Sequence, residues 1–496
     1  MHPIVEPVHS DARENALEAD ITVVGAGAAG LYTAICAATG GARVVLISAT
    51  PLAQTASYWA QGGLAAALAA EDSPELHLAD TERAGRGVVR RRAAEVLVAE
   101  APRCVHDLQA LGVRFDADRF GRLALGLEGG HSVRRVVHAG GSATGRRVVR
   151  QLSARVAGEP GIIVLEGARA GALCLEEGRV RGVLCEDGRL IDSRAVAIST
   201  GGGAALWERT TNPPGSQGLG LLLAHAAGAQ LADLEFMQFH PTAVIGVKGR
   251  EGFLITEAIR GEGATLHDCH GERFVEELAP RDEVSLAIQA RLQETGSGSV
   301  GLDMRSIDPA LFPNVIGALR TAGLDPSREL IPVAPAAHYM MGGIVTDLHA
   351  RTTVAGLYAI GEAACTGLHG ANRLASNSLS ECFVFAARAA ASALQEPALA
   401  PLRTPRPLTL AAAPQVSAQT RAALWRDGGI ERSAESLTRL GSDPHPLARL
   451  IARCALARNE SRGTHRRSDH PDTDPALDGR HMVISAEDES TWQTWE

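Results

Sequence analysis

The chain has 496 residues, 45% of them apolar, and a formal net charge of −9. These values indicate a globular protein of about two to four domains with a large core, and the scattered basic residues exclude electrostatic recruitment of nucleic acid. The sequence contains no apolar stretch of about 18 residues, and residues 1–20 carry acids instead of a basic and then apolar leader, so we expect neither a membrane span nor export.

The first predicted elements form a strand–turn–helix–strand unit around a glycine-rich turn. Ile21–Val24 reads as a buried strand, and the turn after it has the form G-x-G-x-x-G at residues 25–30. A helical run continues to about Thr39, and Arg43–Ile47 reads as a second strand. This context is typical of a dinucleotide-binding fold, although a Gly/Ala-rich turn without a ligand is the alternative.

The three glycines of this turn have separate roles. Gly25 permits the tight turn, Gly27 lets the backbone approach a pyrophosphate, and Gly30 lets the helix pack closely on the strand. Ala28 and Ala29 lie between them at the start of the helix. The acidic residue that binds ribose hydroxyls at the end of the second strand in NAD sites is replaced by Ser48, which argues against an ordinary NAD site.

The remaining elements are expected in an α/β order with an insertion. A helix is predicted at Arg91–Leu111, and turns at Glu177-Gly178 and Asp187-Gly188 indicate a strand meander. Its strands are Ile162–Glu166, Gly171–Glu176, Arg179–Glu186 and Leu190–Ser199, followed by Thr200–Gly203. Residues 234–338 lose the strand–helix alternation and suggest an inserted domain, after which Gly356–Glu362 returns to a buried strand. Residues 396–418 read as a linker, and a helical tail is expected from Arg421 to the end.

The predicted fold is therefore α/β: a Rossmann-type FAD-binding domain with an inserted α+β capping domain and a C-terminal helical domain. The expected boundaries are 1–233 and 339–400 for the two parts of the FAD-binding domain, 234–338 for the capping domain, and 401–496 for the linker and the helical domain. The eight cysteines show no C-x-x-C pair and no metal-ligand spacing, so we expect reduced thiols in a cytoplasmic protein and no metal site.

The segment His369–Leu379 places Arg373 beside small polar residues and before an apolar helical run, Glu381–Leu394. A guanidinium matches a carboxylate and keeps its charge where water is excluded. Ser376, Asn377 and Ser378 suit a helix start, whose free N–H groups point at electron-rich ligand atoms. The segment suits an acidic substrate and a redox cofactor together, the alternative being an ordinary capped helix with a surface arginine.

Seven segments in a fixed order resemble the succinate dehydrogenase/fumarate reductase flavoprotein family. They are Ala60–Gly63, Glu128–Ser132, Gln238–Thr242, Thr256–Gly263, Pro280–Asp282, Pro335–Tyr339 and His369–Leu379. The resemblance implies FAD as cofactor, bound by Gly25, Gly27, Ala28, Ala29, Gly30, Ser48, Ser57, Gln61, Gly62, Gly63, Glu362, Ser378 and Leu379. Glu362, at the end of a predicted strand, would take hydroxyls of the ribityl chain, unless it is a plain strand end.

A dicarboxylate substrate needs cations and hydrogen-bond donors around each carboxylate. Separate parts of the chain supply them at His240, Thr256, Arg281, His338 and Arg373. Holding both ends of the substrate would place its carbon chain over a flavin, and much of the barrier reduction would be positional. The alternative for each histidine is a buried, hydrogen-bonded core residue.

The resemblance further implies that Arg281 handles the substrate proton together with Glu257 and Arg260. A free arginine is a very poor base, because its unperturbed pKa is above ~12. We therefore interpret Arg281, Glu257 and Arg260 as a relay that acts as a unit, with Glu257 and Arg260 on one helix face. A purely structural ion pair is the competing interpretation.

Two residues favour a member of the family that oxidises L-aspartate. The histidine that tethers FAD in many succinate and fumarate enzymes corresponds to Ala56, so the FAD should be non-covalent. Glu128 would attract the ammonium group of aspartate and disfavour succinate, the alternative being a loop carboxylate in a glycine-rich turn. The sequence shows no membrane anchor and no iron–sulfur ligand set, which agrees with a member of this kind but is only weak support for it.

The expected reaction converts aspartate to iminoaspartate at the start of NAD biosynthesis, with oxygen or fumarate accepting electrons and quinolinate synthase receiving the product. A soluble fumarate reductase or succinate-oxidising flavoprotein is the alternative. A non-catalytic FAD-binding protein is a third hypothesis, because Leu219 replaces an acidic FAD contact of the family and should weaken FAD binding. Leu127 replaces a frequent basic residue, and the role of Glu460–Gly463 is left open, with docking of the tail as one reading.

Overall fold

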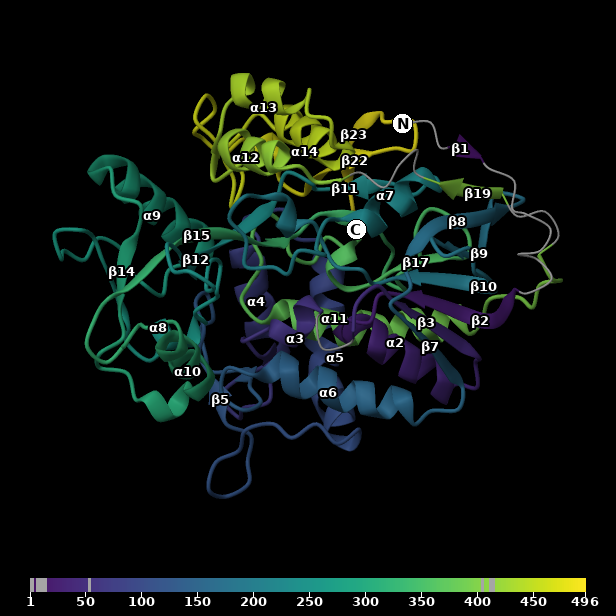
Figure 1. The fold of residues 1–496 in the computed structure, drawn as a ribbon, viewed down its shortest axis with the longest axis horizontal. Coiled ribbons are helices and arrows are strands. Elements are labelled where there is room, and N and C mark those ends of the chain that lie inside the picture. The colour runs from purple at the N-terminus through teal and green to yellow at the C-terminus, as the bar shows by residue number, and fades with distance from the viewer. Residues whose placement is uncertain (1–3, 6–15, 52–54, 403–405, 410–414) are drawn as a thin grey trace.

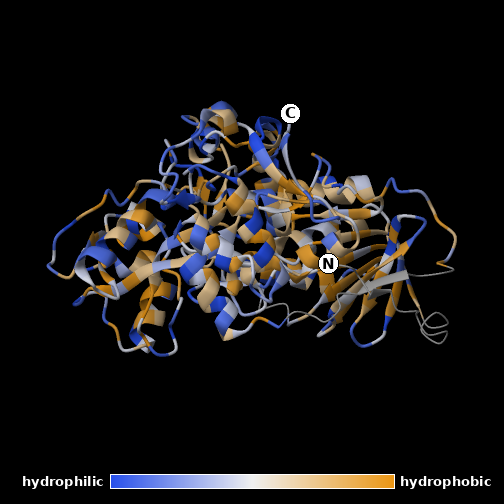
Figure 2. Ribbon diagram, turned by 90° about the horizontal axis from the view of Figure 1, so that it is seen from above, coloured by the Kyte–Doolittle hydropathy of each residue, from blue (hydrophilic) through white to orange (hydrophobic). Residues whose placement is uncertain are grey.

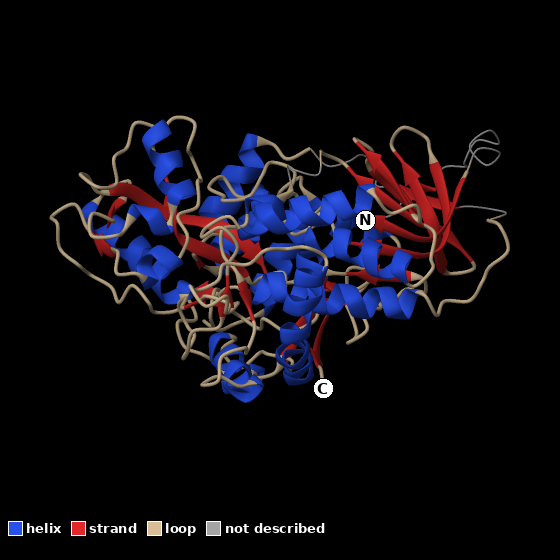
Figure 3. Ribbon diagram, turned by 90° about the horizontal axis from the view of Figure 1, so that it is seen from below, coloured by secondary structure: helices blue, strands red, loops and turns tan. Residues whose placement is uncertain are grey.

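The computed structural model describes residues 4–5, 16–51, 55–402, 406–409 and 415–496. A large sheet and its helices occupy one end of the molecule, and a smaller sheet with its own helices occupies the other (Figure 1). A third group of helices, near the C-terminus, lies above the junction between them. Figure 3 shows the same arrangement from below, with the large sheet and the small sheet separated by a central layer of helices.

The centre of the large sheet is parallel and runs in the order β7-β3-β2-β10. Its strands are β2 (Leu17–Val24), β3 (Val44–Ser48), β7 (Ile162–Glu166), β10 (Leu190–Ile198) and β17 (Leu357–Ala359). β17 pairs with the last residues of β10, Val196 facing Leu357, so the chain returns to this sheet after its long insertion. The strands are mostly apolar (Figure 2), and β3, β10, β17 and the second half of β2 are mostly buried, as expected for a parallel sheet covered on both faces, while the edge strand β7 is partly exposed.

An antiparallel meander extends this sheet. β8 (Ala170–Glu176) and β9 (Arg179–Cys185) lead into β10, with Glu177 and Gly178 both at positive φ in the connecting turn. Beyond β8 lie β19 (Arg406–Thr409) and β1 (Ile4–Val5). β19 falls within residues 396–418, which the sequence predicted to be a linker, so part of that linker is a sheet strand.

Two glycines make the first turn possible. Gly25 has a φ of +108°, and a Cβ there would lie 2.4 Å from the Ser199 carbonyl oxygen. A Cβ on Gly30 would lie 1.9 Å from the Gly25 carbonyl oxygen, so any side chain would push helix α2 away from the strands. Both residues therefore hold the N-terminus of α2 against the ends of β2 and β10.

Helices lie on the large sheet and beside it, some packing on the strands and others on the neighbouring helices. They are α2 (Ala28–Thr39), α3 (Ala56–Trp59), α4 (Pro74–Ala84), α5 (Arg91–Ala110), α6 (Thr144–Ala157), α7 (Leu219–Ala226) and α11 (Asn377–Ala393). α2, α5, α6 and α11 share one apolar core with the sheet strands. A small sheet of β4 (Leu64–Ala65), β5 (Leu125–Gly126) and β6 (Val136–Val137) lies beside them.

The inserted segment forms an antiparallel sheet in the order β12-β15-β14-β13. Its elements are β12 (Met237–Val244), α8 (Ala258–Gly261), β13 (Thr265–His267), α9 (Arg281–Thr295), β14 (Val300–Asp303), α10 (Pro313–Thr321) and β15 (Ile331–Met340). It has a separate apolar core. The pairing of β12 with β15 shifts register after Gln238 and again after His240, and such bulges re-aim the neighbouring side chains.

The C-terminal region is helical as far as Ala457 and then changes, whereas the sequence predicted helix to the end. Its helices are α12 (Ala418–Asp427), α13 (Ala434–Leu440) and α14 (Pro446–Ala457), and two short strands, β20 (Glu431–Arg432) and β21 (Arg466–Arg467), pair in parallel beside them. The chain ends in β22 (Arg480–Ile484) and β23 (Ser490–Thr494). They complete a sheet with β11 (Leu231–Ala232), β16 (Gly343–Val345) and β18 (Ala364–Cys365).

All eight cysteines lie in the described part of the chain and are free thiols. Within the described ranges, no helix combines the length and the apolar composition needed to cross a bilayer.

Candidate active site

A cavity of about 1210 Å³ lies where the large sheet meets the inserted segment. Its walls come from the C-terminal ends of β2, β3 and β10, the N-termini of α2 and α11, and residues of β12 and β15. Ligands of open α/β sheets bind at this edge of the strands. The volume exceeds the ~300–1,000 Å³ of most small-molecule sites and leaves room for a dinucleotide and a substrate together.

The cavity wall includes every residue that the sequence proposed for the site except Gly30 and Arg260. Gly30 lies behind the wall, in the contact between α2 and Gly25. Arg260 is buried beneath the wall, where it reaches Glu257. Leu219, the substitution expected to weaken cofactor binding, also lines the cavity, at the first position of α7.

The end of the cavity nearest the glycine-rich turn is built to receive a large polar ligand. The Ser57 hydroxyl accepts a hydrogen bond of 3.0 Å from the Ala28 N–H, which ties α3 to the N-terminus of α2. The Ser48 hydroxyl donates a hydrogen bond of 2.6 Å to the carbonyl of Thr50, which also lines the cavity. Among the described residues, the buried polar atoms Thr200 Oγ1 and Gln61 Oε1 in this wall have no hydrogen-bond partner.

Glu362 stands at the other side of this polar region. Its Oε1 accepts a hydrogen bond of 3.0 Å from the Met340 N–H. A Cβ on Gly202 would lie 2.5 Å from the same oxygen, so the glycine leaves the space that Glu362 occupies. Burial raises the pKa of Glu362 to about 7. The side chain is thus available as a donor or an acceptor for ligand hydroxyl groups.

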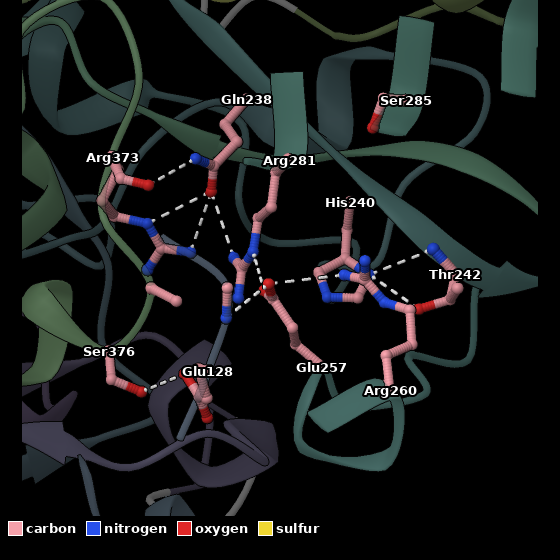
Figure 4. Close-up of polar contacts among 12 residues, drawn as sticks. Glu128, Gln238, His240, Thr242, Glu257, Arg260, Arg281, Ser285, Arg373 and Ser376 are labelled. Carbon is pink, nitrogen blue, oxygen red and sulfur yellow. Dashed lines mark hydrogen bonds and ion pairs between the residues drawn. The ribbon is translucent and has the colours of Figure 1, made fainter. Parts of the chain in front are cut away.

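The far end of the cavity is dominated by two arginines that share one amide. Arg281 donates from Nη1 to Gln238 Oε1 at 3.1 Å, and Arg373 donates to the same oxygen from Nε at 3.3 Å and from Nη2 at 3.0 Å (Figure 4). Arg373 also donates to the Ser378 hydroxyl and lies 4.3 Å above the Tyr339 ring. Burial and the neighbouring Arg281 lower the pKa of Arg373 to about 10, so it stays cationic at neutral pH.

Arg373 is therefore not a surface residue. It is 5% exposed, and its guanidinium is held by hydrogen bonds to Gln238 and Ser378. Ser376 stands at the N-cap of α11 with a φ of +62°, and its side chain makes no capping hydrogen bond. The interpretation of this segment as a capped helix with a surface arginine is wrong.

Two histidines face each other across the substrate end, with ring centroids 5.1 Å apart. His240 Nδ1 accepts a hydrogen bond of 3.3 Å from the Thr242 N–H, which leaves the proton on Nε2. His338 Nδ1 contacts the Thr211 hydroxyl at 2.8 Å. Burial and the nearby arginines hold both pKa values well below the usual value, so the rings are neutral donors, not cations.

Glu257 lies beneath Arg281. Its Oε2 accepts a hydrogen bond of 2.6 Å from Arg281 Nε, and its Oε1 accepts one of 2.9 Å from the Gly129 N–H. Arg260 Nη2 approaches Oε1 to 3.5 Å, and Arg260 also donates to the Glu277 carbonyl. Burial alone would raise the pKa of Glu257, but the charges of Arg281 and Arg260 outweigh it and lower the pKa. The three side chains form a continuous charged chain that begins at the cavity.

Two of the carboxylates proposed from the sequence, Glu128 and Glu257, line this end of the cavity. Of these two, Glu128 is the one that has no hydrogen bond with an arginine. Its Oε2 accepts a hydrogen bond of 2.7 Å from Ser376, and its Oε1 lies 3.4 Å from His138 Nε2. Burial would raise the pKa of Glu128, but the contacts with His138 and Ser376 lower it to about 2. Glu128 is therefore anionic at neutral pH.

Comparison with known proteins agrees with this geometry. Residues 20–379 match the model of an FAD binding domain, and residues 442–494 match the fumarate reductase flavoprotein C-terminal domain. L-Aspartate oxidase from Caulobacter vibrioides is 45% identical over 92% of this chain and 96% of its own length. The enzyme of the same name from Streptomyces coelicolor is 41% identical over 96% of this chain and 93% of its own length. The chain belongs to the L-aspartate oxidase family.

Solved structures place this family beside the respiratory flavoproteins. The FrdA chain of a quinol fumarate reductase variant from E. coli superposes with a TM-score of 0.86 at 27% identity and covers 97% of either chain. Sdh1 from Mycobacterium smegmatis superposes with a TM-score of 0.80 at 28% identity, over 97% of this chain and 95% of the other. The predicted α/β fold with capping and C-terminal parts is confirmed.

As a member of the L-aspartate oxidase family, the chain is an FAD-binding flavoprotein, and the cavity fits that cofactor. The glycine-rich turn opens toward the cavity beside the N-terminus of α2, where phosphates bind. Thr200 Oγ1 and Gln61 Oε1 offer polar atoms without a hydrogen-bond partner among the described residues, and Glu362, with a pKa raised to about 7, can donate to or accept from a ligand hydroxyl. Ala56, which lines the cavity, has no nucleophilic atom that could form a covalent bond to FAD.

The sequence did not lead us to predict the roles of four residues in this active site. They are Gln238, Ser376 as a partner of Glu128, His138 and Thr211. Gln238 and Ser376 lie inside segments that carried the family resemblance, and that position was an available signal. Nothing local distinguishes His138 or Thr211, because each becomes part of the site through residues distant in sequence.

Proposed function

We propose that this protein oxidises L-aspartate to iminoaspartate with FAD, passing the electrons to fumarate or oxygen, as the first step of de novo NAD biosynthesis. One observation carries the proposal. The anionic Glu128 carboxylate faces the same cavity end as Arg281 and Arg373. The arginines suit the two carboxylates of a C4 acid, and Glu128 adds an anion that suits an ammonium group.

The substrate is held by residues from two parts of the chain. Arg373 and His338 would bind one carboxylate, while His240 and Thr256 would bind the other. Because the histidines are neutral, they donate hydrogen bonds without adding charge, and the site balances two substrate carboxylates against two arginines. Fixing both ends leaves the α carbon in one position, and this positioning supplies a large share of the rate.

The oxidation removes a hydride from the α carbon and one proton from the ammonium group, and leaves a protonated imine, while the released proton passes to solvent. Bound FAD accepts a hydride. The chain's own residues manage the remaining charge: Glu128 holds the ammonium, and Arg281, paired with Glu257, transfers the proton when fumarate is reduced. Because Arg281 donates to Glu257, which Arg260 also approaches, the three side chains would act as one proton relay and Arg281 would not act alone.

Two wider features belong to the same proposal. The product imine hydrolyses, so we propose that quinolinate synthase receives it. The free thiols agree with a reducing compartment, and we propose that the protein works in the cytoplasm.

The test is anaerobic reduction of the flavin. The purified yellow protein is mixed with L-aspartate or with succinate, and the flavin absorbance is followed. We expect aspartate to bleach the flavin and succinate to do so much more slowly. Bleaching by succinate and not by aspartate would instead favour a soluble fumarate reductase or succinate-oxidising flavoprotein, a function supported by the structural likeness to FrdA. Retained absorbance with neither substrate turned over would favour a non-catalytic flavoprotein.

A further inference from the structure

Gln238 is the acceptor that the two cavity arginines have in common. Its Oε1 receives three hydrogen bonds, one from Arg281 and two from Arg373, at 3.0 to 3.3 Å. Its Nε2 donates to Asn372 Oδ1 at 2.9 Å and to the Arg373 carbonyl at 2.8 Å. The side chain is 0% exposed, and both ends of the amide are fully engaged.

A second row of contacts lies directly behind the arginines. Asp282 follows Arg281 at the start of α9, and Asn372 precedes Arg373. Asn372 Nδ2 donates to Asp282 Oδ1 at 3.1 Å, while its Oδ1 receives the bond from Gln238. The two arginines and their chain neighbours therefore form a closed loop of hydrogen bonds through Gln238.

The loop is anchored from outside. Arg86 donates to both oxygens of Asp282, from Nε at 3.2 Å and from Nη2 at 3.3 Å. Arg466, in the C-terminal region, lies 3.8 Å from the same carboxylate. Burial raises the pKa of Asp282, and these two cations oppose that effect. The charged side chain fixes the start of α9 against three other parts of the chain.

The choice of an amide at position 238 has an electrostatic reason. Two guanidinium groups in a buried site repel each other, and burial and Arg281 lower the pKa of Arg373. A carbonyl dipole draws both groups to one point without cancelling their charge. A carboxylate there would pair with both arginines and remove the positive charge that a dicarboxylate needs. An apolar residue would let the arginines separate.

We propose that Gln238, Asn372 and Asp282 are positioning residues that fix the register between Arg373, which holds a substrate carboxylate, and Arg281, which handles the proton. This inference rests on the proposed function. Arg281 belongs to α9 of the inserted segment, and Arg373 belongs to the segment before α11 (Figure 4). The Gln238 amide therefore joins the two halves of the site and sets where the proton-handling group stands along a bound C4 acid.

Kinetics and binding of fumarate and succinate test the inference, because neither ligand needs the ammonium contact at Glu128. Binding is read from the change in the oxidised flavin spectrum on adding succinate. For Gln238→Leu we expect kcat for fumarate reduction to fall about 100-fold, the cost of a misplacement of about 1 Å. The succinate Kd should stay within about threefold, because both arginines keep their charge.

Gln238→Glu has the same size and pairs with both arginines, so it should fold even if Gln238→Leu does not. We expect its succinate Kd to rise about tenfold or more, because the added carboxylate competes with the ligand for the arginines. Asn372→Ala should reproduce the kcat effect of Gln238→Leu in part, and the double variant should lose less than the product of the two single losses.

Ser285→Ala is the matched control. Ser285 lies four residues after Arg281 on α9, and its hydroxyl donates to the Phe239 carbonyl of β12 at 2.9 Å without touching either arginine. This variant loosens the same α9–β12 contact and should leave kcat within about twofold. Equal kcat losses in Ser285→Ala and Gln238→Leu, or an unchanged succinate Kd in Gln238→Glu, would overturn the inference. A wild-type protein that turns over neither aspartate nor fumarate would overturn the proposed function instead.

Discussion

The Ser376 hydroxyl donates a hydrogen bond of 2.7 Å to Glu128 Oε2, across 248 positions of sequence. The same hydroxyl accepts a hydrogen bond of 3.1 Å from the Gly63 N–H. Ser376 has a φ of +62°, a conformation that is unfavourable for a residue with a Cβ. Its backbone strain and its two contacts together hold the Glu128 carboxylate in one orientation, with the cavity on its open side.

Removal of this hydroxyl should weaken aspartate binding selectively. In Ser376→Ala the left-handed backbone keeps its cost, so the change isolates the hydroxyl. A hydrogen bond to a charged group contributes about 1.5–3 kcal/mol, and we expect KM for aspartate to rise about tenfold or more. KM for fumarate should change less than about threefold, because fumarate has no ammonium group to place beside Glu128.

Ser380→Ala provides the control for this change. Ser380 lies on the same helix, is buried, and donates to the Ala65 carbonyl at 2.7 Å without contacting Glu128. It should leave both KM values unchanged. If Ser376→Ala raises KM for aspartate and fumarate alike, the Gly63 contact, and not Glu128, carries the effect.

Glu128→Gln should separate the two reactions of the enzyme. The glutamine keeps an acceptor for Ser376 but removes the charge that faces the substrate ammonium. Loss of one partner from a buried charge pair costs about 2–5 kcal/mol, so kcat/KM for aspartate should fall about 30-fold or more. The loss should be the same at any pH above about 4, since the pKa of Glu128 is lowered to about 2. Fumarate reduction that falls by the same factor would contradict the ammonium contact.

The local elements could be predicted from sequence because their causes are local. The strand at Ile162–Glu166 and the helix that ends at Thr39 have the predicted limits, and Arg91–Ala110 differs from its predicted helix by one residue. The structural roles of Gly25 and Gly30 could also be predicted, because a positive φ and a close backbone contact each require glycine at a single position.

The C-terminal strands could not be predicted in the same way. β22 pairs with β11, some 250 residues earlier in the chain, and its residues Met482, Val483 and Ile484 are buried in apolar clusters beside the buried His481. His481 Nδ1 lies 2.6 Å from Asp233 Oδ2, and the residues next to His481 in the sequence give no indication of this partner. β22 also pairs with β23 in a local hairpin, but its other edge and the partner of His481 are distant in sequence, so only part of this structure leaves a signal among neighbouring residues.

In the active site, too, some features could be predicted from the sequence and others could not. The types of residue at Arg281, Arg373 and Glu128 indicate a dicarboxylate with a cation, and all three face one cavity. The bridging amide of Gln238 depends on how β12, α9 and the segment before α11 come together, and a bulge at Gln238 helps to aim it. Sequence motifs therefore indicate which groups act, while the tertiary structure decides which groups place them.

Glu257→Gln tests whether the buried charged chain transfers a proton or only stabilises the fold. The variant keeps an acceptor for the Gly129 N–H but removes the anion between Arg281 and Arg260. If Glu257 belongs to the relay, kcat for fumarate reduction should fall by about 10²–10⁴, the usual contribution of general acid–base catalysis. The solvent deuterium isotope effect on kcat should rise, because proton transfer becomes slower relative to the other steps.

A structural ion pair gives another result. Breaking a buried pair costs about 3–5 kcal/mol of folding stability, so a purely structural Glu257 would show itself as a lower unfolding midpoint and lost flavin. The protein that remained folded and flavin-loaded would then have a normal kcat. Succinate binding, read from the flavin spectrum, confirms in either case that the site is assembled.

The buried histidines should make the fold sensitive to mild acid, and His77 is the clearest case. It is 0% exposed, and its Nε2 lies 2.8 Å from Asn377 Oδ1 at the start of α11. Burial lowers the pKa of His77 to about 3. In the unfolded chain the same imidazole takes up a proton near pH 6.5. Below that pH the unfolded state binds more protons than the folded state, so stability is present above about pH 6.5 and is lost as the pH falls.

The size of this loss depends on the pH interval. Each pH unit below the unfolded pKa costs about 1.4 kcal/mol per histidine, so His77 should account for about 2 kcal/mol between pH 6.5 and 5.0. In His77→Gln, which keeps a donor for Asn377, the free energy of unfolding in urea should be lower than wild type at pH 7.5. The difference should shrink by about 2 kcal/mol at pH 5.0, because the glutamine has no proton to gain. His106→Gln, a change at an exposed position of α5, should leave the pH dependence as in wild type. Parallel curves for wild type and His77→Gln would mean that His77 is protonated in the folded protein and that another group governs the acid sensitivity.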